Sequence, residues 1–502
     1  MIAIHRHQTL HLLNHHRYYL ALGASIIFFT LSQYLIRHFM VNFDEYDHIA
    51  AGYLISQGRS LYAQIFSHHF PLPYYWTQLF TPLWTQPFRG ITVFRLSFTL
   101  FTLLAIAPVA ILSRSPKTIY SFSIWLIVVG LIASLFHGNS LLSDTFTAIL
   151  LGSITWLSLP TILGWESTGF SRILCLTLLV VLSLWNQILI LPLVLIPFII
   201  GSRQYWKYVI GIYLLGLGLP LLYFFFNHQL SDFYQQVIWF NYQIYPQYYF
   251  DLINHGTTNQ VLILLSNHSQ WLINWSTTMN QLQAVIFIGF LGFNFLLIKQ
   301  RNWRALIVIA LLYASAHTRE IKIFPGSLFN AGIYPHILIT LIGWPILLFQ
   351  LKSHRWMAML GIVLTSILGI LLIKPIYLQS YQPGYNYHVF WSVRQDIGQQ
   401  IQQVTSPNDP ILIYPHDVDL YYFAQRQPID KFLYWFPWIN DVTWYRQERI
   451  DALQQTPPAV IFLGNPAFKD DATYYRDLFP QLLDQYQPIY ESQYGTLYQY
   501  QP

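Results

Sequence analysis

The chain of 502 residues has little charge and almost no cysteine. Only 9% of its residues are Asp, Glu, Lys or Arg, whereas an average soluble chain carries roughly 25%. Because 54% of the residues are hydrophobic, too few polar side chains are left to cover a water-exposed surface, and a wholly soluble protein is excluded. The single cysteine, Cys175, lies inside an apolar run, which excludes an intramolecular disulfide framework and a cysteine-based metal site.

Long apolar runs are what the chain has instead. A helix needs about 20 apolar residues to cross the roughly 30 Å of hydrocarbon in a bilayer. Basic residues accumulate in the cytoplasmic loops that join such helices, so we place the basic breaks between the runs in the cytoplasm. These breaks hold Arg6, Arg17, Arg114, Lys117, Arg172, Arg203, Lys207, Lys299, Arg301, Arg304, Lys352 and Arg355.

The runs predict an α-helical polytopic membrane protein of about eleven transmembrane helices, with a cytoplasmic N-terminus. The predicted spans are 19–40, 91–112, 119–136, 141–160, 173–185, 188–200, 208–226, 281–298, 305–316, 328–350 and 356–377. We read 173–200 as a hairpin of two short spans because Arg172 and Arg203 are then both cytoplasmic. A single tilted span there would put the two arginines on opposite sides and reverse the membrane side of every later loop. We expect a multi-pass protein of the plasma or inner membrane.

Residues 378–502 have a different composition, with 13 of the 21 acidic residues and many turn formers. Short β-like runs at 411–414 and 460–463 alternate with polar helical stretches at 390–404 and 445–455. The odd number of spans places this segment on the exoplasmic side. We therefore predict a transmembrane domain at 1–377 and a small soluble α/β domain at 378–502.

Acidic residues in the membrane portion gather at one place. Asp44, Glu45 and Asp47 directly follow the first span, and Asp144 opens the fourth span on the same exoplasmic face. An acid at membrane depth is costly and usually faces a cavity or a partner, so these four residues are site candidates. The alternative is a solvated loop that only ends a helix.

The first exoplasmic loop, 41–90, begins with a predicted amphipathic helix at 45–57. Further on, His68 and His69 precede Pro71 and Pro73, which we expect to hold an extended segment. Adjacent histidines in an extended segment point in different directions, so we predict no metal site there. The pattern neither requires nor excludes a divalent metal at the four acids, and it identifies no cofactor.

These motifs resemble a known family. Asp44-Glu45 after the first span is followed by Ala51-Gly52, Gly58, Leu61-Tyr62 and Pro71-Leu72-Pro73-Tyr74-Tyr75. This loop resembles that of polytopic glycosyltransferases of the glycosyltransferase-C class, nearest to the protein O-mannosyltransferase and lipid A aminoarabinose-transferase group. Ser143-Asp144-Thr145 resembles the second acidic position of that group, and His317-Thr318-Arg319 with 329–335 is similar to a late exoplasmic segment. The chain departs from the family at Phe70, where the family often has His-Pro-Pro or Pro-Pro.

The resemblance implies inverting transfer of a sugar from a polyprenyl-phosphate donor to an exoplasmic lipid, glycan or protein. Such a transfer needs a carboxylate to accept the proton of the attacking hydroxyl, and Asp44 is the leading candidate, supported by Glu45 and Asp144. We expect the acceptor side of the site to contain Asp47, Tyr62, His68 and His69.

The departing lipid phosphate needs fixed positive charge, which exoplasmic cations can supply. We choose Arg319 and Lys322, together with His317, because they break the inside-positive pattern. The alternative is an ordinary headgroup contact, and Arg59 and Arg89 are the reserve cations.

Two other classes compete with the glycosyltransferase interpretation. A transporter or lipid flippase would suit about eleven spans, although the chain has no internal repeat and its acids lie at the surface instead of the bilayer midplane. A noncatalytic membrane partner would use the first loop only for docking. Nothing in the sequence indicates nucleic-acid binding.

Overall fold

The computed structural model describes residues 2–37, 43–83, 87–245, 276–316, 331–351, 354–380, 387–464 and 483–501. The chain divides into two compact units. The first contains residues 1–40, 95–220 and 259–380, and the second contains 41–94, 221–258 and 381–502. The C-terminal segment thus packs with two segments that come much earlier in the chain. Whether residues 378–502 fold as a domain of their own stays a prediction.

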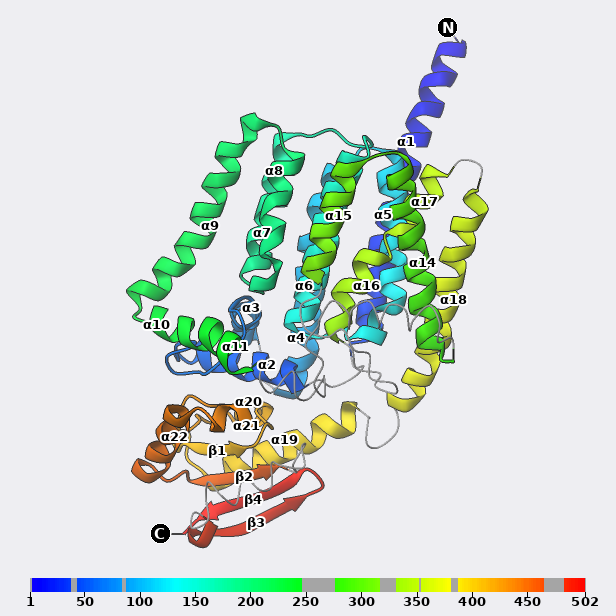
Figure 1. The fold of residues 1–502 in the computed structure, drawn as a ribbon. Coiled ribbons are helices and arrows are strands. Elements are labelled where there is room, and N and C mark those ends of the chain that lie inside the picture. The colour runs from blue at the N-terminus through cyan, green and yellow to red at the C-terminus, as the bar shows by residue number, and fades with distance from the viewer. Residues whose placement is uncertain are drawn as a thin grey trace. The chain divides into compact units, whose positions relative to one another are not determined.

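The first unit is a bundle of apolar helices (Figure 1). Its elements are α1 (Ile2–Leu35), most of α4 (Pro87–Leu112), α5 (Pro116–Ile132), η2 (Ala133–Phe136), α6 (Ser143–Ile162), α7 (Phe170–Leu184), η3 (Ile188–Leu195), α8 (Ile196–Ile200), η4 (Arg203–Tyr205), most of α9 (Trp206–Phe226), α14 (Thr278–Lys299), α15 (Trp303–Ala316), η6 (Ala331–Ile333), α16 (Tyr334–Thr340), α17 (Gly343–Gln350) and α18 (Arg355–Ser380).

Seven helices within the described residues are long and apolar enough to cross a membrane. They are Arg17–Leu35, Gly90–Leu112, Pro116–Phe136, Ser143–Ile162, Arg203–Phe226, Thr278–Lys299 and Arg355–Lys374. The remaining predicted spans coincide with the shorter apolar helices Phe170–Leu184, Ile190–Ile200, Trp303–Ala316 and Tyr334–Gln350. The polytopic helical fold is confirmed, whereas the number of crossings stays a prediction.

The stretch 173–200 is not one continuous helix. Helix α7 ends at Leu184, and a break at Trp185, Asn186 and Gln187 precedes η3, which packs back against α7. The side-chain amide of Asn186 donates to the backbone oxygen of Ser143 over 2.7 Å, so the break is held by α6. The break and the packing of η3 against α7 agree with the predicted hairpin, whereas two separate membrane crossings here stay a prediction.

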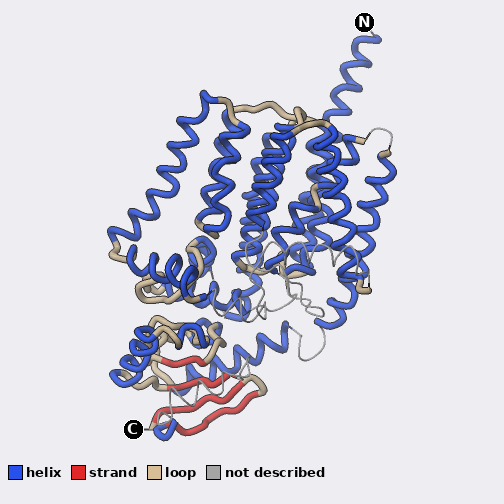
Figure 2. The backbone as a smooth tube through the Cα atoms, in the orientation of Figure 1, coloured by secondary structure: helices blue, strands red, loops and turns tan. Residues whose placement is uncertain are grey.

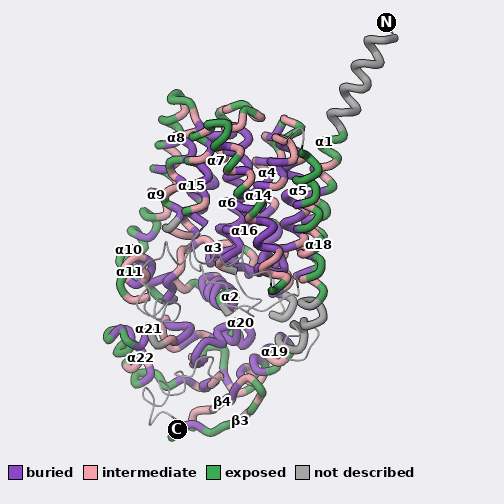
Figure 3. The backbone as a smooth tube through the Cα atoms, turned by 45° about the vertical axis from the view of Figure 1, so that its right-hand side comes forward, coloured by how far each residue is buried: buried purple, intermediate pink, exposed green. Residues whose placement is uncertain are grey.

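Burial separates the inner helices from the outer ones. In α6, 89% of the most apolar window is buried, compared with 17% in the α9 segment. Helices α6 and α16 are purple along most of their length in Figure 3, whereas α18 is largely green. Exposed leucines and phenylalanines such as Leu214 and Phe226 on α9 are expected where a helix faces lipid. The protein is an integral multi-pass membrane protein.

The second unit contains short helices and the four-stranded sheet (Figure 2). Its helices are α2 (Phe43–Ser56), α3 (Leu72–Phe80), η1 (Thr81–Leu83), α10 (Leu230–Phe233), the π-helical turn η5 (Tyr234–Trp239), α11 (Phe240–Gln243), α19 (Tyr387–Val404), α20 (Asp419–Ala424), α21 (Pro437–Asn440), α22 (Thr443–Gln455) and η7 (Leu483–Gln485).

The sheet has the strand order β1-β2-β4-β3. Strands β1 (Ile411–Tyr414) and β2 (Val460–Gly464) are parallel, with Ile411 opposite Val460, and β3 (Tyr486–Ser492) and β4 (Gly495–Tyr500) add an antiparallel hairpin. The two predicted strands and the predicted helices at 390–404 and 445–455 are confirmed. The fully buried β1 is a short apolar run, as expected for a strand covered on both faces.

Two prolines act differently from the prediction. Pro71 has helical backbone angles and caps α3, and Pro73 lies in the first turn of that helix. The predicted extended segment is therefore wrong beyond Pro71. The reason is that proline fits the first helical turn, where its missing N–H has no partner to lose.

Candidate active site

The first turns of α2 place the acidic residues. Asp44 and Asp47 are three residues apart and so lie on the same face of the helix, whereas Glu45 points elsewhere. Asp44 is exposed, but Glu45 and Asp47 are buried. Carboxylates near a helix N-terminus are favoured because the unpaired N–H groups there carry partial positive charge.

Asp44 and Asp47 line a small cavity of about 40 Å³ within the second unit. The first loop contributes the two acids with His68 and His69. The C-terminal segment contributes the rest of the lining: His416, Val418, Tyr434 and Phe436. Residues almost 400 positions apart in the chain thus meet around one space, with two carboxyl groups, three imidazoles and one phenol.

Asp47 has a raised proton affinity. Burial raises the pKa of Asp47 from 3.8 to about 7, the hydroxyl of Tyr74 opposes this by hydrogen bonding to its carboxylate, and the nearby charge of Asp44 adds to it. The Tyr74 oxygen also lies 2.6 Å from the hydroxyl of Ser67. The result is a carboxyl group that exchanges its proton near neutral pH, as is typical of functional sites.

The histidines of the first loop lie together instead of diverging. The ring centroids of His68 and His69 are 4.1 Å apart, so the prediction that they point in different directions is wrong. The segment bends at this point and is not an extended strand. His68 Nδ1 lies 3.0 Å from the hydroxyl of Tyr434, which joins the first loop to the C-terminal segment.

Tyr62 has a supporting position. It is fully buried, and its hydroxyl donates to the backbone oxygen of His69 over 3.0 Å. Its own backbone oxygen accepts from the side-chain amide of Gln236, whose oxygen accepts from the backbone N–H of Ser67 over 3.0 Å. Tyr62 therefore holds the histidine segment in place and does not line the cavity.

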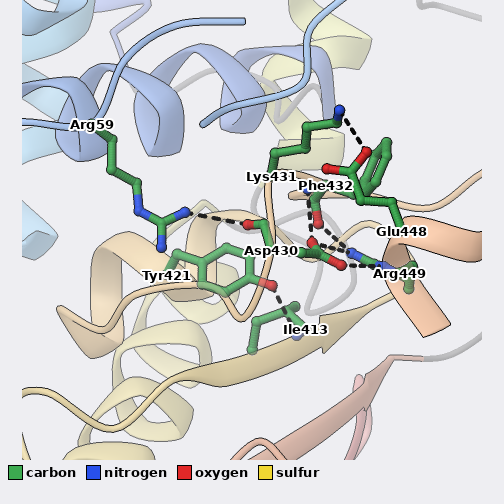
Figure 4. A network of polar contacts seen from close by, with 8 residues as sticks. All are labelled: Arg59, Ile413, Tyr421, Asp430, Lys431, Phe432, Glu448 and Arg449. Atoms are coloured by element: carbon green, nitrogen blue, oxygen red, sulfur yellow. Dashed lines mark hydrogen bonds and ion pairs between the residues drawn. The ribbon is translucent and has the colours of Figure 1, made fainter. Parts of the chain in front are cut away.

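Paired ions and backbone contacts hold the C-terminal lining in place (Figure 4). Arg449 binds both carboxylate oxygens of Asp430 at 2.8 and 3.0 Å, and the two side chains are almost fully buried. The backbone N–H of Phe66 donates to the oxygen of Lys431 over 2.7 Å. The segment 430–436 is thus fixed against the first loop, which sets the position of Tyr434.

A second buried ion cluster lies next to His416. Arg394 pairs with Asp417 and with Asp419, whose carboxylate oxygen Oδ2 lies 3.5 Å from Nε of the guanidinium. The ring of His416 stacks on Phe436 at a centroid distance of 5.9 Å. The cluster anchors the residues that directly follow β1, where the chain turns toward the cavity.

The remaining predicted site residues lie elsewhere. Asp144 is buried in the first turn of α6, in the first unit. Glu45 is buried on α2 and is not part of the cavity lining. His317, Arg319 and Lys322 lie outside the described residues. Their predicted roles stay predictions.

The reserve cation Arg59 has a defined position. Its guanidinium donates to the backbone oxygens of Pro428 over 2.9 Å, Asp430 over 3.2 Å and Gln64 over 3.3 Å. Burial lowers the pKa of Arg59, although the charge of Asp430 opposes this. Arg59 therefore ties the first loop to the C-terminal segment. The side chain of Arg89 lies outside the described residues.

Metal binding has no assembled ligand set in the part of the chain that the structure describes. No group of three or more His, Cys, Asp or Glu side chains there is placed to hold an ion. The cavity contains suitable residue types, but their arrangement is one of stacked rings and hydrogen bonds instead of convergent ligands.

Sequence reasoning missed the contribution of the C-terminal segment. His416 lies two residues after strand β1, at the carboxyl end of a parallel strand pair, where α/β modules commonly place functional residues. That position was the available signal. Tyr434 and Phe436 had no comparable signal, because they reach the cavity only through long-range packing.

The architecture defines a class: a polytopic membrane protein with a bundle of apolar helices and a second unit that contains the first loop and a C-terminal α/β segment.

No family model matches the sequence, and no curated protein matches it. Among solved structures the chain is similar to ArnT from Cupriavidus metallidurans in the apo state, with 12% identity, a TM-score of 0.53, and coverage of 95% of this chain and 97% of that one.

A structure of the same ArnT bound to undecaprenyl phosphate matches with 13% identity, a TM-score of 0.48, and the same coverage of 95% and 97%. At such identities the likeness to the apo structure establishes the fold. The predicted resemblance to the aminoarabinose-transferase group is thereby confirmed as a resemblance of fold over nearly the whole chain.

Proposed function

We propose that the protein is a membrane glycosyltransferase that moves a sugar from a polyprenyl-phosphate-linked donor to an exoplasmic lipid, glycan or protein. The observation that carries the proposal is the cavity at the start of α2, where Asp44 and Asp47 face two histidines of the first loop. The ArnT-like fold supports it, because ArnT is a lipid A aminoarabinose transferase.

Asp44 is the proposed general base. An acceptor hydroxyl attacks C1 of the donor sugar, the bond from C1 to the phosphate oxygen breaks, and the carboxylate of Asp44 takes the hydroxyl proton. The polyprenyl phosphate leaves with the bonding electrons. A single displacement of this kind inverts the configuration at C1. Asp44 suits the role because its side chain is exposed beside the cavity.

The neighbouring residues are proposed to orient the acceptor. Asp47, His68 and His69 line the same cavity and offer hydrogen-bonding groups to sugar hydroxyls. Tyr62 acts as a positioning residue through the backbone of His69. Glu45 and Asp144 are proposed to support the carboxylate chemistry.

Arg319, Lys322 and His317 are proposed to bind the donor phosphate. Arg319→Ala is expected to remove roughly 2 to 4 kcal/mol of transition-state stabilisation, a typical loss for one electrostatic contact, and Arg319→Lys is expected to restore only part of it. The measurement is kcat/KM for the lipid-linked donor. Equal activity in the wild type and both variants would assign the phosphate to another cation.

The proposed location of the active site is the exoplasmic side. In a Cys175→Ser background, cysteines at the exposed positions Gln64 and Gln454 are expected to react with a membrane-impermeant maleimide added to intact cells. A cysteine at Lys117 is expected to react only after the membrane is opened. Labelling of Lys117→Cys from outside would invert the topology and remove the basis for an exoplasmic site.

The enzyme interpretation is tested with the purified full-length protein and a radiolabelled polyprenyl-phosphate sugar. A glycosyltransferase consumes the donor and yields free polyprenyl phosphate. A transporter or flippase would move the donor across a proteoliposome membrane without altering it, and a docking protein would do neither.

A further inference from the structure

Helix α22 presents a stripe of side chains that the proposed chemistry does not use. Trp444, Gln447, Glu448, Asp451 and Gln455 recur at spacings of three and four residues and therefore share one face of the helix. All five are exposed. The opposite face is buried through Tyr445, Arg449 and Leu453.

This stripe forms one wall of a surface cleft of about 630 Å³ within the second unit. The other wall comes from Arg59, Gln64 and the segment 429–431. Figure 4 shows Arg59, Asp430, Lys431 and Glu448 around this region. The volume falls in the range of about 300 to 1,000 Å³ that is usual for binding sites of small organic molecules.

The charges of the cleft nearly cancel. Asp430 is neutralised by Arg449, and Lys431 lies 2.7 Å from the carboxylate of Glu448. Arg59 adds one positive charge to the lining and Asp451 adds one negative charge. The Asp451 carboxylate accepts a hydrogen bond from the Gln447 amide over 2.7 Å. A cleft with this balance favours a neutral ligand over a nucleic acid, a phosphate or a basic peptide.

The polar groups and the indole match a sugar chain. Gln64, Gln447 and Gln455 offer amide donors and acceptors, which can bind adjacent hydroxyl groups. Trp444 packs on Trp239 at 5.1 Å and is still 51% exposed, so its ring is available as an apolar platform. Aromatic rings that contact the apolar face of a sugar while amides bind its hydroxyls are a common basis of carbohydrate recognition.

The first loop and the segment that follows α20 each line both the cleft and the cavity with Asp44. Gln64 and Lys431 line the cleft, whereas His68 and Tyr434 line the cavity. The segments are joined between these points by the hydrogen bond from Phe66 to Lys431. Gln64 and His68 are four residues apart, and four residues of chain span at most about 14 Å. The cleft and the cavity are therefore within the reach of a short oligosaccharide.

We propose that the cleft between α22 and the first loop binds the non-reacting residues of a neutral oligosaccharide acceptor, whose end then reaches the cavity at Asp44. This assignment rests on the proposed function, because it takes the bound glycan to be the acceptor. The recognition of a neutral glycan by Trp444 and Gln447 does not depend on turnover and is measured separately.

The test uses saturation-transfer NMR of the full-length protein in detergent. The probe is a pool of neutral tetra- to hexasaccharides released from envelope glycans of the cells that produce the protein. Trp444→Ala is expected to weaken binding by roughly three- to tenfold, the loss for one aromatic contact, and Gln447→Ala by a smaller factor. Trp303→Ala removes an exposed tryptophan on α15 and is expected to leave binding unchanged.

The result that would overturn the proposal is a wild-type protein without any signal from the pool, or unchanged binding in Trp444→Ala and Gln447→Ala. If Trp444→Ala associates more weakly than the wild type with lipid vesicles but binds the glycan pool equally well, Trp444 belongs to the membrane surface. In a transfer assay, Trp444→Ala should raise KM for the acceptor and leave kcat unchanged. Binding without any transfer by the wild type would reject the proposed function and keep the glycan site.

Discussion

Replacing Asp44 with asparagine is expected to abolish sugar transfer while the protein stays folded. Asparagine keeps the size and polarity of the side chain but cannot accept the proton. General-base assistance contributes roughly 10²- to 10⁴-fold, and the substitution also removes a charge that orients the acceptor, so the loss should reach or exceed that range. Because Asp44 is exposed at the start of α2, the change removes no core packing. The measurement is the rate of sugar transfer in detergent beside donor binding by the same preparation.

Three further variants test which carboxylate is the general base. Glu45→Gln and Asp144→Asn are expected to lose less activity, as supporting groups would. Asp396→Asn changes an exposed acid on α19 and serves as the matched control with wild-type activity. Retained turnover in Asp44→Asn with an inactive Asp144→Asn would move the base to α6. Loss of donor binding in Asp44→Asn would make Asp44 a binding residue.

Replacing Asp47 with asparagine is expected to stabilise the protein at high pH. Because the pKa of Asp47 is raised from 3.8 to about 7, the folded protein keeps this proton where the unfolded chain has lost it. Stability therefore falls as pH rises from about 4 to about 7, and above that pH the buried charge costs up to about 4 kcal/mol. Asparagine is neutral at every pH, so it avoids this cost.

The expected stabilisation is measured as the unfolding temperature in detergent across pH. Asp47→Asn should unfold at a higher temperature than the wild type at pH 8, and the two curves should converge near pH 4. Asp396→Asn should follow the wild type throughout, since its carboxyl is exposed. A less stable Asp47→Asn at pH 8 would show that the ionised carboxylate contributes more through Tyr74 than its burial costs.

The features that were predicted correctly depend on residues that are close together in the sequence. The apolar runs and basic breaks gave the helical bundle because span length and loop charge are properties of neighbouring residues. Strands β1 and β2 were predictable for the same reason, as short apolar runs bounded by turn formers. The pairing of Asp44 with Asp47 follows from helical spacing once α2 is recognised.

The parts that failed depend on contacts between distant segments. Nothing near Tyr434 indicates that it meets His68, because that contact joins residues 366 positions apart. The ring contact of His68 with His69 depends on a bend that is held by Tyr62 and Gln236 from other elements. The burial of Asp47 likewise depends on residues outside α2, since Tyr74 donates a hydrogen bond to its carboxylate and Ser67 contacts the Tyr74 hydroxyl.

Sugar transfer from a lipid phosphate releases the polyprenyl phosphate and labels the acceptor, and both products can be counted in one reaction. Purified wild-type protein is incubated with a radiolabelled polyprenyl-phosphate sugar and an envelope glycan extract, and the free polyprenyl phosphate and labelled glycan are quantified. We expect the two products to appear in equal amounts and neither to appear with Asp44→Asn. Intact donor recovered in full from the wild-type reaction, or donor moved across proteoliposomes unchanged, would contradict sugar transfer by this protein.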